Sequence, residues 1–350
     1  MRKLHVRKVV WISSVFFSLI ISASANDDEE NFLDTSLEEI LAIPLDVNAV
    51  NILEAHIHKK NEWMVGYRFM HMGMQGNLSG EQQVSNADIL KKYRIAPTSM
   101  EMEMHMASLM YAPTDDLTLM AMIPYQRISM THVNRMGKQF TTKSEGLGDL
   151  KLMLNAVAFR TKWDQHIISL KGGLSLPTGS INKHDDTPMG TDQKLPYPMQ
   201  LGSGTFDFLP GISYAGLTRD WGWGAQMIGT VRTGKNSNHY RLGDKLDSSL
   251  WVSRIWQNWV STSLRVNGQW WGSIKGADPE LNPRMVPTAN PNIRGGKQID
   301  LLLAVELYAP QGVLKGQHLG LEIGLPIYQS LDGPQMEMDW KVSAGWQWTF

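Results

Sequence analysis

The chain has 350 residues, of which 42% are hydrophobic and only 19% are charged, and it contains 31 glycines, 21 methionines and no cysteine. This composition excludes a disordered protein and a disulfide-rich scaffold. The 33 basic and 34 acidic side chains nearly cancel, so no net charge favours binding to nucleic acid. No run of about 18 apolar residues follows the first residues, which excludes a bundle of membrane-spanning helices.

Residues 1–25 have the three parts of an export signal. Basic residues near the start precede the apolar run 9–21, and Ala23-Ser24-Ala25 supplies the small residues of a cleavage site. We expect cleavage after Ala25. An N-terminal membrane anchor is the alternative, but the apolar run is short and acidic residues follow it at once. The absence of cysteine fits an oxidising destination.

Residues 26–61 are expected to form a periplasmic N-terminal segment with one short helix. Thr35 and Glu38 make a capping-box pattern, and Pro44 ends the short apolar stripe that follows. This segment is a candidate plug for the domain behind it. We expect no other helix, because no later stretch repeats every 3.6 residues.

Residues 62–350 alternate between apolar and polar side chains, which is typical of β-strands with one apolar face. Near the C-terminus, for example, Val342, Trp346 and Trp348 alternate with Ser343 and Gln347. We predict 12 strands at about 63–74, 98–111, 117–131, 144–160, 165–177, 204–217, 222–233, 246–258, 259–272, 297–309, 318–329 and 336–350.

The connections between these strands alternate in length. Short turns such as 112–116 and 161–164 alternate with long polar loops such as 178–203 and 273–296, and only the last outer connection, about 330–335, is short. An even number of strands with this asymmetry is typical of a transmembrane antiparallel β-barrel. A soluble β-sandwich would share the alternation but not the long strands or the unequal loops. In lipid, only a closed sheet satisfies every backbone group of spanning strands.

The chain ends with aromatic residues at every second position, Trp346, Trp348 and Phe350. This looks like the C-terminal assembly signal of bacterial outer-membrane proteins. It implies outer-membrane lipid and the barrel assembly machinery as partners, and the outer membrane of a Gram-negative bacterium as the location. Lipid-facing Trp and Met side chains are consistent with a monomer.

We assign the faces of the strands on the rule that acidic side chains avoid hydrocarbon. This rule turns the four methionines of 100–106 towards lipid, and Met336 and Met338 likewise, with Glu337, Asp339 and Lys341 inward. The residues expected to line the lumen and a substrate path are Arg68, Met70, Met72, Glu101, Glu103, His105, Met120, Met122, Asp149, Lys151 and Arg265.

Part of this set would form a mixed site in the outer half of the lumen, and two interpretations are open. In the first, the site binds a ligand or a cation, and Met70, Met72 and His105 are candidate ligands of a soft metal such as Cu(I). In the second, the side chains brace the barrel and methionine fills irregular space. The second is favoured, because methionines two apart on a strand lie about 7 Å apart and need ligands from a neighbouring strand to share an ion.

The other charges expected in the lumen carry both signs, which suggests a braced polar interior and not an ion-selective filter. In the outer loops, the stretch His184-Asp185-Asp186 and the pair Asp278 and Glu280 could bind a divalent cation or be solvated charges. The further lumen charges are Lys171, Asp207, Arg232, Glu306 and Glu322.

The sequence lacks the motifs of common enzymes. It has no nucleophile elbow G-x-S-x-G, no zinc helix H-E-x-x-H and no phosphate loop. We therefore expect no enzyme activity and no cofactor.

Three short motifs follow one another along the chain: Gly146-Leu147-Gly148-Asp149-Leu150, then Gly173-Leu174-Ser175-Leu176-Pro177-Thr178-Gly179, then Leu201-Gly202-Ser203-Gly204. Together they resemble the signatures of the outer-membrane transporter family labelled "MetA-pathway of phenol degradation". The resemblance implies a 12-stranded barrel, an architecture related to fatty-acid channels and uptake of small, often aromatic or hydrophobic compounds. It implies no catalytic residues. The many methionines and His105 depart from a typical channel for aromatic compounds.

The sequence therefore predicts an outer-membrane channel or transporter for a small, hydrophobic or aromatic compound. Two alternatives stay open. One is a protein that binds or handles copper at the outer membrane, and the other is a structural or adhesion barrel whose long loops carry the function.

Overall fold

The computed structural model describes residues 58–161 and 165–350, which belong to one compact unit spanning Leu45–Phe350. The expected export signal, its cleavage site at Ala25 and nearly all of the candidate plug 26–61 lie outside the described residues. Among the residues that are described, no helix is long and apolar enough to cross a membrane.

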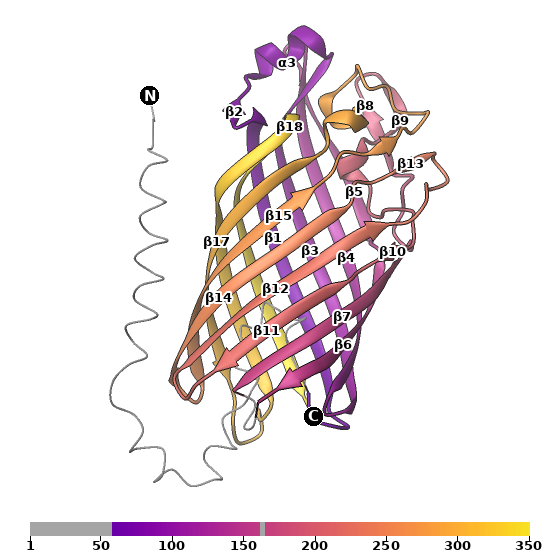
Figure 1. Cartoon of the computed structure of the whole chain (residues 1–350). Coiled ribbons are helices and arrows are strands. Elements are labelled where there is room, and N and C mark those ends of the chain that lie inside the picture. Colours follow the sequence, from indigo (N-terminus) through magenta and orange to yellow (C-terminus); the bar gives the residue numbers. More distant parts are fainter. Residues whose placement is uncertain (1–57, 162–164) are drawn as a thin grey trace, which may run out of the picture. The chain divides into compact units, whose positions relative to one another are not determined.

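The described chain forms a closed antiparallel β-barrel (Figure 1). Each wall element pairs with the next one along the chain, and the pairing of β1 with β18 closes the circle. The wall elements are β1 (Trp63–Gly80), β3 (Ile95–Thr114), β4 (Leu117–Asn134), β6 (Leu150–Arg160), β7 (His166–Leu176), β11 (Gly211–Leu217), β12 (Trp221–Arg232), β14 (Lys245–Gln257), β15 (Val260–Trp271), β17 (Gly296–Tyr308) and β18 (Gln317–Thr349).

The element β18 passes through the wall twice. Its residues 318–331 pair with β17, and its residues 331–349 pair with β1. The two halves lie side by side, as a hydrogen bond of 2.9 Å from the Gln329 side chain to the Met338 carbonyl shows. The described wall therefore has the even number of passes that the sequence predicts, and the short outer connection near residue 331 is the turn between the last two.

Two of the predicted strands are each broken into two elements. The stretch 144–160 becomes β5 (Gln139–Leu147) and β6, which pair with different parts of β4. The stretch 204–217 becomes β10 (Asp207–Phe208) and β11, with Pro210 between them. Proline has no N–H for the ladder, so the strand is interrupted there.

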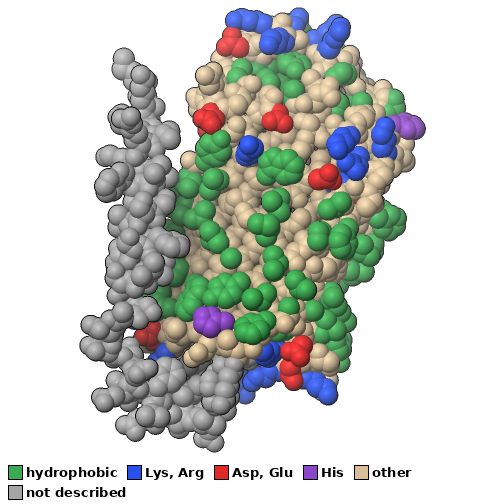
Figure 2. All heavy atoms as spheres, in the orientation of Figure 1, with side chains coloured by type: hydrophobic (Ala, Val, Ile, Leu, Met, Phe, Trp, Pro, Cys, Tyr) green, Lys and Arg blue, Asp and Glu red, His purple; other side chains and the backbone are tan. Residues whose placement is uncertain are grey.

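The outward face of the barrel carries a belt of aliphatic side chains. On β17 and β18, Leu301, Leu303, Leu321 and Ile323 are 37% to 63% exposed. Figure 2 shows hydrophobic side chains over the middle of the wall and charged side chains mainly towards its two ends. Such a belt on a closed barrel is the surface that faces the hydrocarbon of a membrane.

Aromatic side chains gather at the short-turn end of the barrel, where Trp63 and the C-terminal Phe350 are joined by backbone hydrogen bonds. Trp63 stacks on Tyr111 with 4.4 Å between ring centroids, and Arg254 lies 4.9 Å above the Trp221 ring. Aromatic rings of this kind mark a membrane–water interface.

The long-loop end, at the top of Figure 1, carries the remaining short elements. The helix α3 (Asn86–Lys92) lies here, so the expectation of no helix beyond residue 61 is wrong. With 7 residues it is too short to show a period, and its start depends on Ser85, whose Oγ accepts a hydrogen bond from Asp88 N. The other elements are β2 (Gln82–Gln83), β8 (His184–Thr187), β9 (Gly190–Lys194), η4 (Tyr197–Met199), β13 (Tyr240–Arg241), β16 (Lys275–Gly276), η5 (Pro287–Ala289) and η6 (Pro291–Ile293).

The aliphatic belt predicts how the barrel responds to a charge in its wall. Leu303→Arg places a cation on the lipid face, and we expect it to lower the free energy of unfolding in lipid vesicles by about 2–4 kcal/mol. The matched control is Gln269→Arg on β15, where Gln269 takes the inward parity of its buried neighbour Asn267. Urea titrations that find equal losses for the two variants would contradict this assignment of faces.

Candidate functional site: the barrel lumen

One side of the lumen is lined by methionine. On β3, Met100 and Met110 are 4% and 1% exposed, whereas Leu109 is 44% exposed on the opposite face. On β4, Met120 and Met122 are buried on the same inner side. The methionines on this side of the lumen, from β1, β3, β4 and β6, are Met64, Met70, Met72, Met74, Met100, Met102, Met104, Met106, Met110, Met120, Met122, Met130 and Met153.

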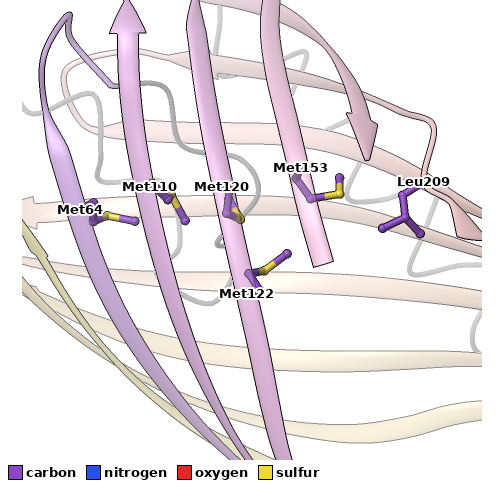
Figure 3. Close-up of a cluster of buried hydrophobic side chains, with 6 residues drawn as sticks. All are labelled: Met64, Met110, Met120, Met122, Met153 and Leu209. Atoms are coloured by element: carbon purple, nitrogen blue, oxygen red, sulfur yellow. The ribbon is translucent and has the colours of Figure 1, made fainter. Parts of the chain in front are cut away.

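These methionines lie opposite one another across neighbouring strands. The inner methionine row, as we name it, consists of four direct register partners on β1, β3, β4 and β6: Met64, Met110, Met120 and Met153. Each of them is at most 7% exposed. Met122 and Leu209 complete the cluster (Figure 3). Leu209 follows β10, so the break before β11 adds a side chain to this cluster.

Nearer the long-loop end, the register continues the same arrangement. Met70 faces Met104, and Met72 faces Met102. These four methionines are only half-buried, so they form the accessible middle of the methionine-lined side. Sequence reasoning found Met70, Met72, Met120 and Met122. It turned Met100, Met102, Met104 and Met106 towards lipid, which is wrong, and it missed Met64, Met110 and Met153. The polar side chain of Ser108, at the same parity as Met110, was available as a signal.

The structure places Glu101, Glu103 and His105 on the outward face, so the expectation that they line the lumen is wrong. The rule failed because β3 is 20 residues long and extends past the aliphatic belt. Its outward side is apolar only towards the short-turn end, at Leu109 and Tyr111. Beyond that point outward acids meet water or lipid headgroups and have no hydrocarbon to avoid.

The outward side chains of β3 pair with those of β1. The Tyr67 hydroxyl lies 2.6 Å from His105 Nδ1, and His71 Nδ1 lies 3.6 Å from a Glu103 carboxylate oxygen. The expected mixed site is therefore not formed, because the wall of the barrel separates His105 from the methionines of β1.

A β-bulge corrects the assignment of Met336 and Met338, which face the lumen and not lipid. The register of β18 against β1 shifts at Asp339, which becomes an extra residue on β18. A bulge reverses the faces of the residues on its two sides. Before it, Met338 Sδ lies 3.1 Å from Gln298 Nε2, and after it Trp340 is 38% exposed on the outward face.

The adjoining side of the lumen, on β15, β17 and β18, is held by ion pairs. Glu322 is 4% exposed, and Arg265 Nη2 lies 2.6 and 2.7 Å from its two carboxylate oxygens. Arg68 Nη2 is 3.8 Å from the same carboxylate, and Ser343 Oγ donates a hydrogen bond of 3.4 Å to it. The arginines from β1 and β15 are thus joined through one buried acid on β18.

A second pair lies beside the first. Lys341 Nζ is 2.6 Å from Asp300, which also accepts a hydrogen bond of 2.7 Å from Gln298. The remaining expected charges behave similarly: Asp207 pairs with Arg232, and Glu306 lies 3.3 Å from His318 Nδ1. Lys171 is buried, and Lys151 is exposed on the inward side of β6 between Met122 and Ser175. Paired charges of both signs brace the interior and do not form an ion filter.

Asp149 anchors the loop that follows β7. Its two carboxylate oxygens accept hydrogen bonds of 2.9 and 2.8 Å from the N–H groups of Gly179 and Ser203. Thr178 Oγ1 accepts from Leu150 N at 2.8 Å and donates to the Gly148 carbonyl. The three sequence motifs therefore meet at one point, and Asp149 holds a loop where a substrate contact was expected.

This anchored loop packs against the lumen side of β3 and β4. Met199 and Leu201 are almost fully buried against Met100, Ile128 and Met130. The Ser144 hydroxyl donates to the Met199 carbonyl at 2.7 Å. The loop thus narrows the mouth at the long-loop end.

Neighbouring loops complete this packing. Tyr197 and Tyr240 lie edge to face at 4.9 Å, and burial raises the pKa of both phenols, so they stay protonated. Tyr197 accepts a hydrogen bond of 3.0 Å from Asp278 N, and Lys194 Nζ is 3.4 Å from the Asp278 carboxylate. Asp278 is thus an ion-pair partner, and the described residues contain no group of three or more His, Asp or Glu side chains placed for a metal.

The charged stretch at the start of β8 serves the loop itself. Asp185 Oδ2 accepts a hydrogen bond of 2.7 Å from Lys143 N, and Asp186 Oδ1 accepts one of 3.0 Å from Asp192 N. His184 lies 3.6 Å from Glu280. These contacts tie β8 to β5 and to β9.

Comparison with known proteins identifies the fold. No protein-family description matches the sequence, and no curated protein matches it either. The structure is similar to that of the COG4313 outer membrane channel from Pseudomonas putida F1, with a TM-score of 0.61 at 15% identity, over 84% of this chain and 97% of that one. The fold is that of an outer-membrane β-barrel.

Two further barrels are less similar. The β domain of the Bordetella autotransporter BrkA has a TM-score of 0.43 at 11% identity, over 83% of this chain and 100% of that one. A mutant of the monoaromatic hydrocarbon channel TodX has a TM-score of 0.39 at 9% identity, over 90% of this chain and 94% of that one.

The anchor at Asp149 predicts an effect on the opening of the barrel. Asp149→Ala removes the acceptor of two loop N–H groups, each charge-assisted bond being worth about 1.5–3 kcal/mol. We expect the loop to loosen and single-channel conductance in planar bilayers to rise. Asp192→Asn removes a charge from the same loop without touching the anchor and should leave conductance unchanged. Equal conductance for Asp149→Ala and the unmodified chain would show that the loop does not narrow the path.

The buried carboxylate predicts a stability difference between the two sides of the wall. Glu322→Gln leaves Arg265 and Arg68 without their anion, and we expect it to lower the free energy of unfolding by about 3–5 kcal/mol. Glu103→Gln breaks a half-exposed pair on the outward face and should cost less than about 1 kcal/mol. Urea unfolding of both variants in detergent micelles measures the difference. Similar losses for the two variants would contradict the prediction that the buried ion pairs of Glu322 contribute more to stability than the outward pair of Glu103.

Proposed function

We propose that the protein is an outer-membrane channel that lets a small hydrophobic compound, aromatic compounds included, cross the membrane. The methionine-lined side of the lumen supports this proposal, because an apolar, flexible and polarisable surface adapts to apolar molecules of different shape. The similarity in fold to a known outer membrane channel is consistent with it. The proposal contains no catalytic step.

The main support for the proposal is that nearly all methionines of the described strands face the lumen and not the lipid. Among the described strand methionines, Met227 stands apart in facing outward, at 47% exposure. The lipid face uses leucine, isoleucine and valine instead, as at Leu303 and Leu321. If methionine were only one more apolar residue, it would be found on both faces. Its concentration inside therefore indicates contact with something that passes through or binds in the lumen.

The charged side suits the same role. Its charges are held in ion pairs, with Arg265 and Arg68 on Glu322 and Lys341 on Asp300, so they are engaged with one another and not with a passing compound. The loop anchored by Asp149 limits the size of what enters. A narrow path with one apolar side selects small hydrophobic molecules over ions and sugars.

The proposed channel also has a proposed route to its membrane. We propose that residues 1–25 direct export and are removed after Ala25, and that the barrel is a monomer in the outer membrane of a Gram-negative bacterium. The barrel assembly machinery would recognise the aromatic C-terminus, where Trp348 and Phe350 are 39% and 57% exposed and stack at 4.7 Å. Membership of the family labelled "MetA-pathway of phenol degradation" is supported by the meeting of its three motifs around Asp149.

Uptake by whole cells tests the proposed function. A Gram-negative host that expresses the chain should take up a radiolabelled monoaromatic compound faster than cells with an empty vector, because lipopolysaccharide slows apolar molecules. Met104→Asp places a charge in the accessible middle of the methionine-lined side and should reduce this uptake at least about tenfold, a barrier of about 1.4 kcal/mol.

Met136→Asp is the matched control, because Met136 lies in a loop and is 87% exposed. It should transport as well as the unmodified chain at the same surface level. Uptake that is the same with the empty vector, or that Met104→Asp leaves unchanged, would refute transport along the methionines.

A further inference from the structure

The inner methionine row has a geometry that hydrophobic transport does not require. Four methionines, Met64, Met110, Met120 and Met153, lie in direct register on four adjacent strands, and the Met153 sulfur lies over Gly173 of β7. Their exposures are between 1% and 7%, far below those of the methionines in the middle of the lumen. A passing molecule has little access to them, so contact with a transported compound does not account for their alignment.

Methionines that are register partners on adjacent strands lie closer together than methionines two residues apart on one strand. Side chains directly opposite each other on antiparallel strands have Cβ atoms about 4.5–5.5 Å apart, against about 7 Å for neighbours two apart along a strand. Methionine has three rotatable bonds beyond Cα, so sulfur atoms from adjacent strands can turn towards one point. Figure 3 shows the row at one level, with Met122 beside it.

The chemistry of the row selects the ion that it can hold. The apolar members of the cluster are Met64, Met110, Met120, Met122, Met153 and Leu209, so five of its six side chains are thioethers. Thioethers are soft ligands that suit Cu(I), whereas Ca²⁺ and Mg²⁺ need oxygen and Zn²⁺ binds thiolate, imidazole or carboxylate. Thioether ligands carry no charge, so at a buried position they favour a univalent ion, because a second charge would raise the cost of desolvation.

We propose that Met64, Met110 and Met120, flanked by Met122, form a binding site for a soft univalent metal ion of the Cu(I) and Ag(I) class. This site differs from the expected set of Met70, Met72 and His105, in which the barrel wall separates His105 from the two methionines. It goes beyond the proposed function, since binding here does not depend on whether a hydrophobic compound crosses the lumen.

Silver titration of the full barrel in detergent tests the site without any change of oxidation state. The chain is labelled with ¹³C at the methionine methyl groups, and silver nitrate is added in chloride-free buffer. We expect one ion per barrel, with the largest methyl shifts at Met64, Met110 and Met120. Zinc should cause no such shifts.

Three variants locate the ion. The row variant Met110→Leu with Met120→Leu should weaken silver binding at least tenfold in calorimetry, because leucine keeps the volume but removes the sulfur. The control Met136→Leu with Met227→Leu, in an exposed loop and on the outward face, should bind like the unmodified chain. The third variant, Met70→Leu with Met104→Leu, should also keep the site. Heat-dependent electrophoretic mobility confirms that each variant is folded.

The proposal is overturned if the unmodified barrel binds no silver, if the row variant binds it as tightly, or if only Met70→Leu with Met104→Leu loses it. Should the row variant not fold, the methyl shifts in the unmodified chain decide the question. The titration needs no transport, so a barrel that takes up hydrophobic compounds without binding silver, or the reverse, separates this inference from the proposed function.

Discussion

The need to satisfy every backbone hydrogen bond of the spanning strands underlies the rest of this structure. In hydrocarbon no water can replace a missing partner, so the sheet must close on itself. Closure is completed by the pairing of β1 with β18, where Trp63 and Phe350 also exchange backbone hydrogen bonds. Once the sheet is closed, alternate residues of each strand must face lipid and the lumen, and the two sets obey different rules.

The lipid face tolerates little besides aliphatic and aromatic side chains. The lumen can be lined either by apolar side chains or by charged side chains that pair with one another. In this barrel the lumen is divided lengthwise. β15, β17 and β18 contribute most of the charges around Glu322 and Asp300, with Arg68 of β1 joining them, and β1, β3, β4 and β6 contribute most of the methionines, with Met336 and Met338 of β18 besides. Buried charges need partners within reach, and here Arg265 and Lys341 each reach their acid across one intervening strand.

The strands could be predicted from the sequence because a period of two that persists over a long segment is typical of a β-strand and of no helix. The face of each strand was harder to predict. The rule that acids avoid hydrocarbon holds within the belt but not beyond it, and Glu101 and Glu103 lie on a part of β3 that continues past the aliphatic side chains. The bulge at Asp339 then inverts the faces along β18, and a single extra residue leaves no mark in the alternation.

The role of Asp149 could not be read from the sequence, because its partners are about 30 and 54 residues away along the chain. Close packing of backbone accounts for the surrounding glycines: a Cβ on Gly202 would overlap the Gly179 carbonyl. The motifs that resemble a transporter family are therefore parts of one loop anchor, and their order along the chain follows the order of the strands they join.

The methionines of the lumen differ in burial, and this difference corresponds to the two roles that we propose for them. The half-buried methionines of the middle, such as Met72 and Met102, can touch a passing molecule and adapt to it. The inner row is almost fully buried, and the register of Met64, Met110 and Met120 places three soft ligands on adjacent strands, as the proposed ion site requires. Because the two groups lie at different heights on the same strands, an ion held in the row would leave the middle of the path free. Methionine is the one apolar side chain whose chemistry suits both proposed roles, because its flexible stem adapts to apolar molecules and its thioether binds soft ions.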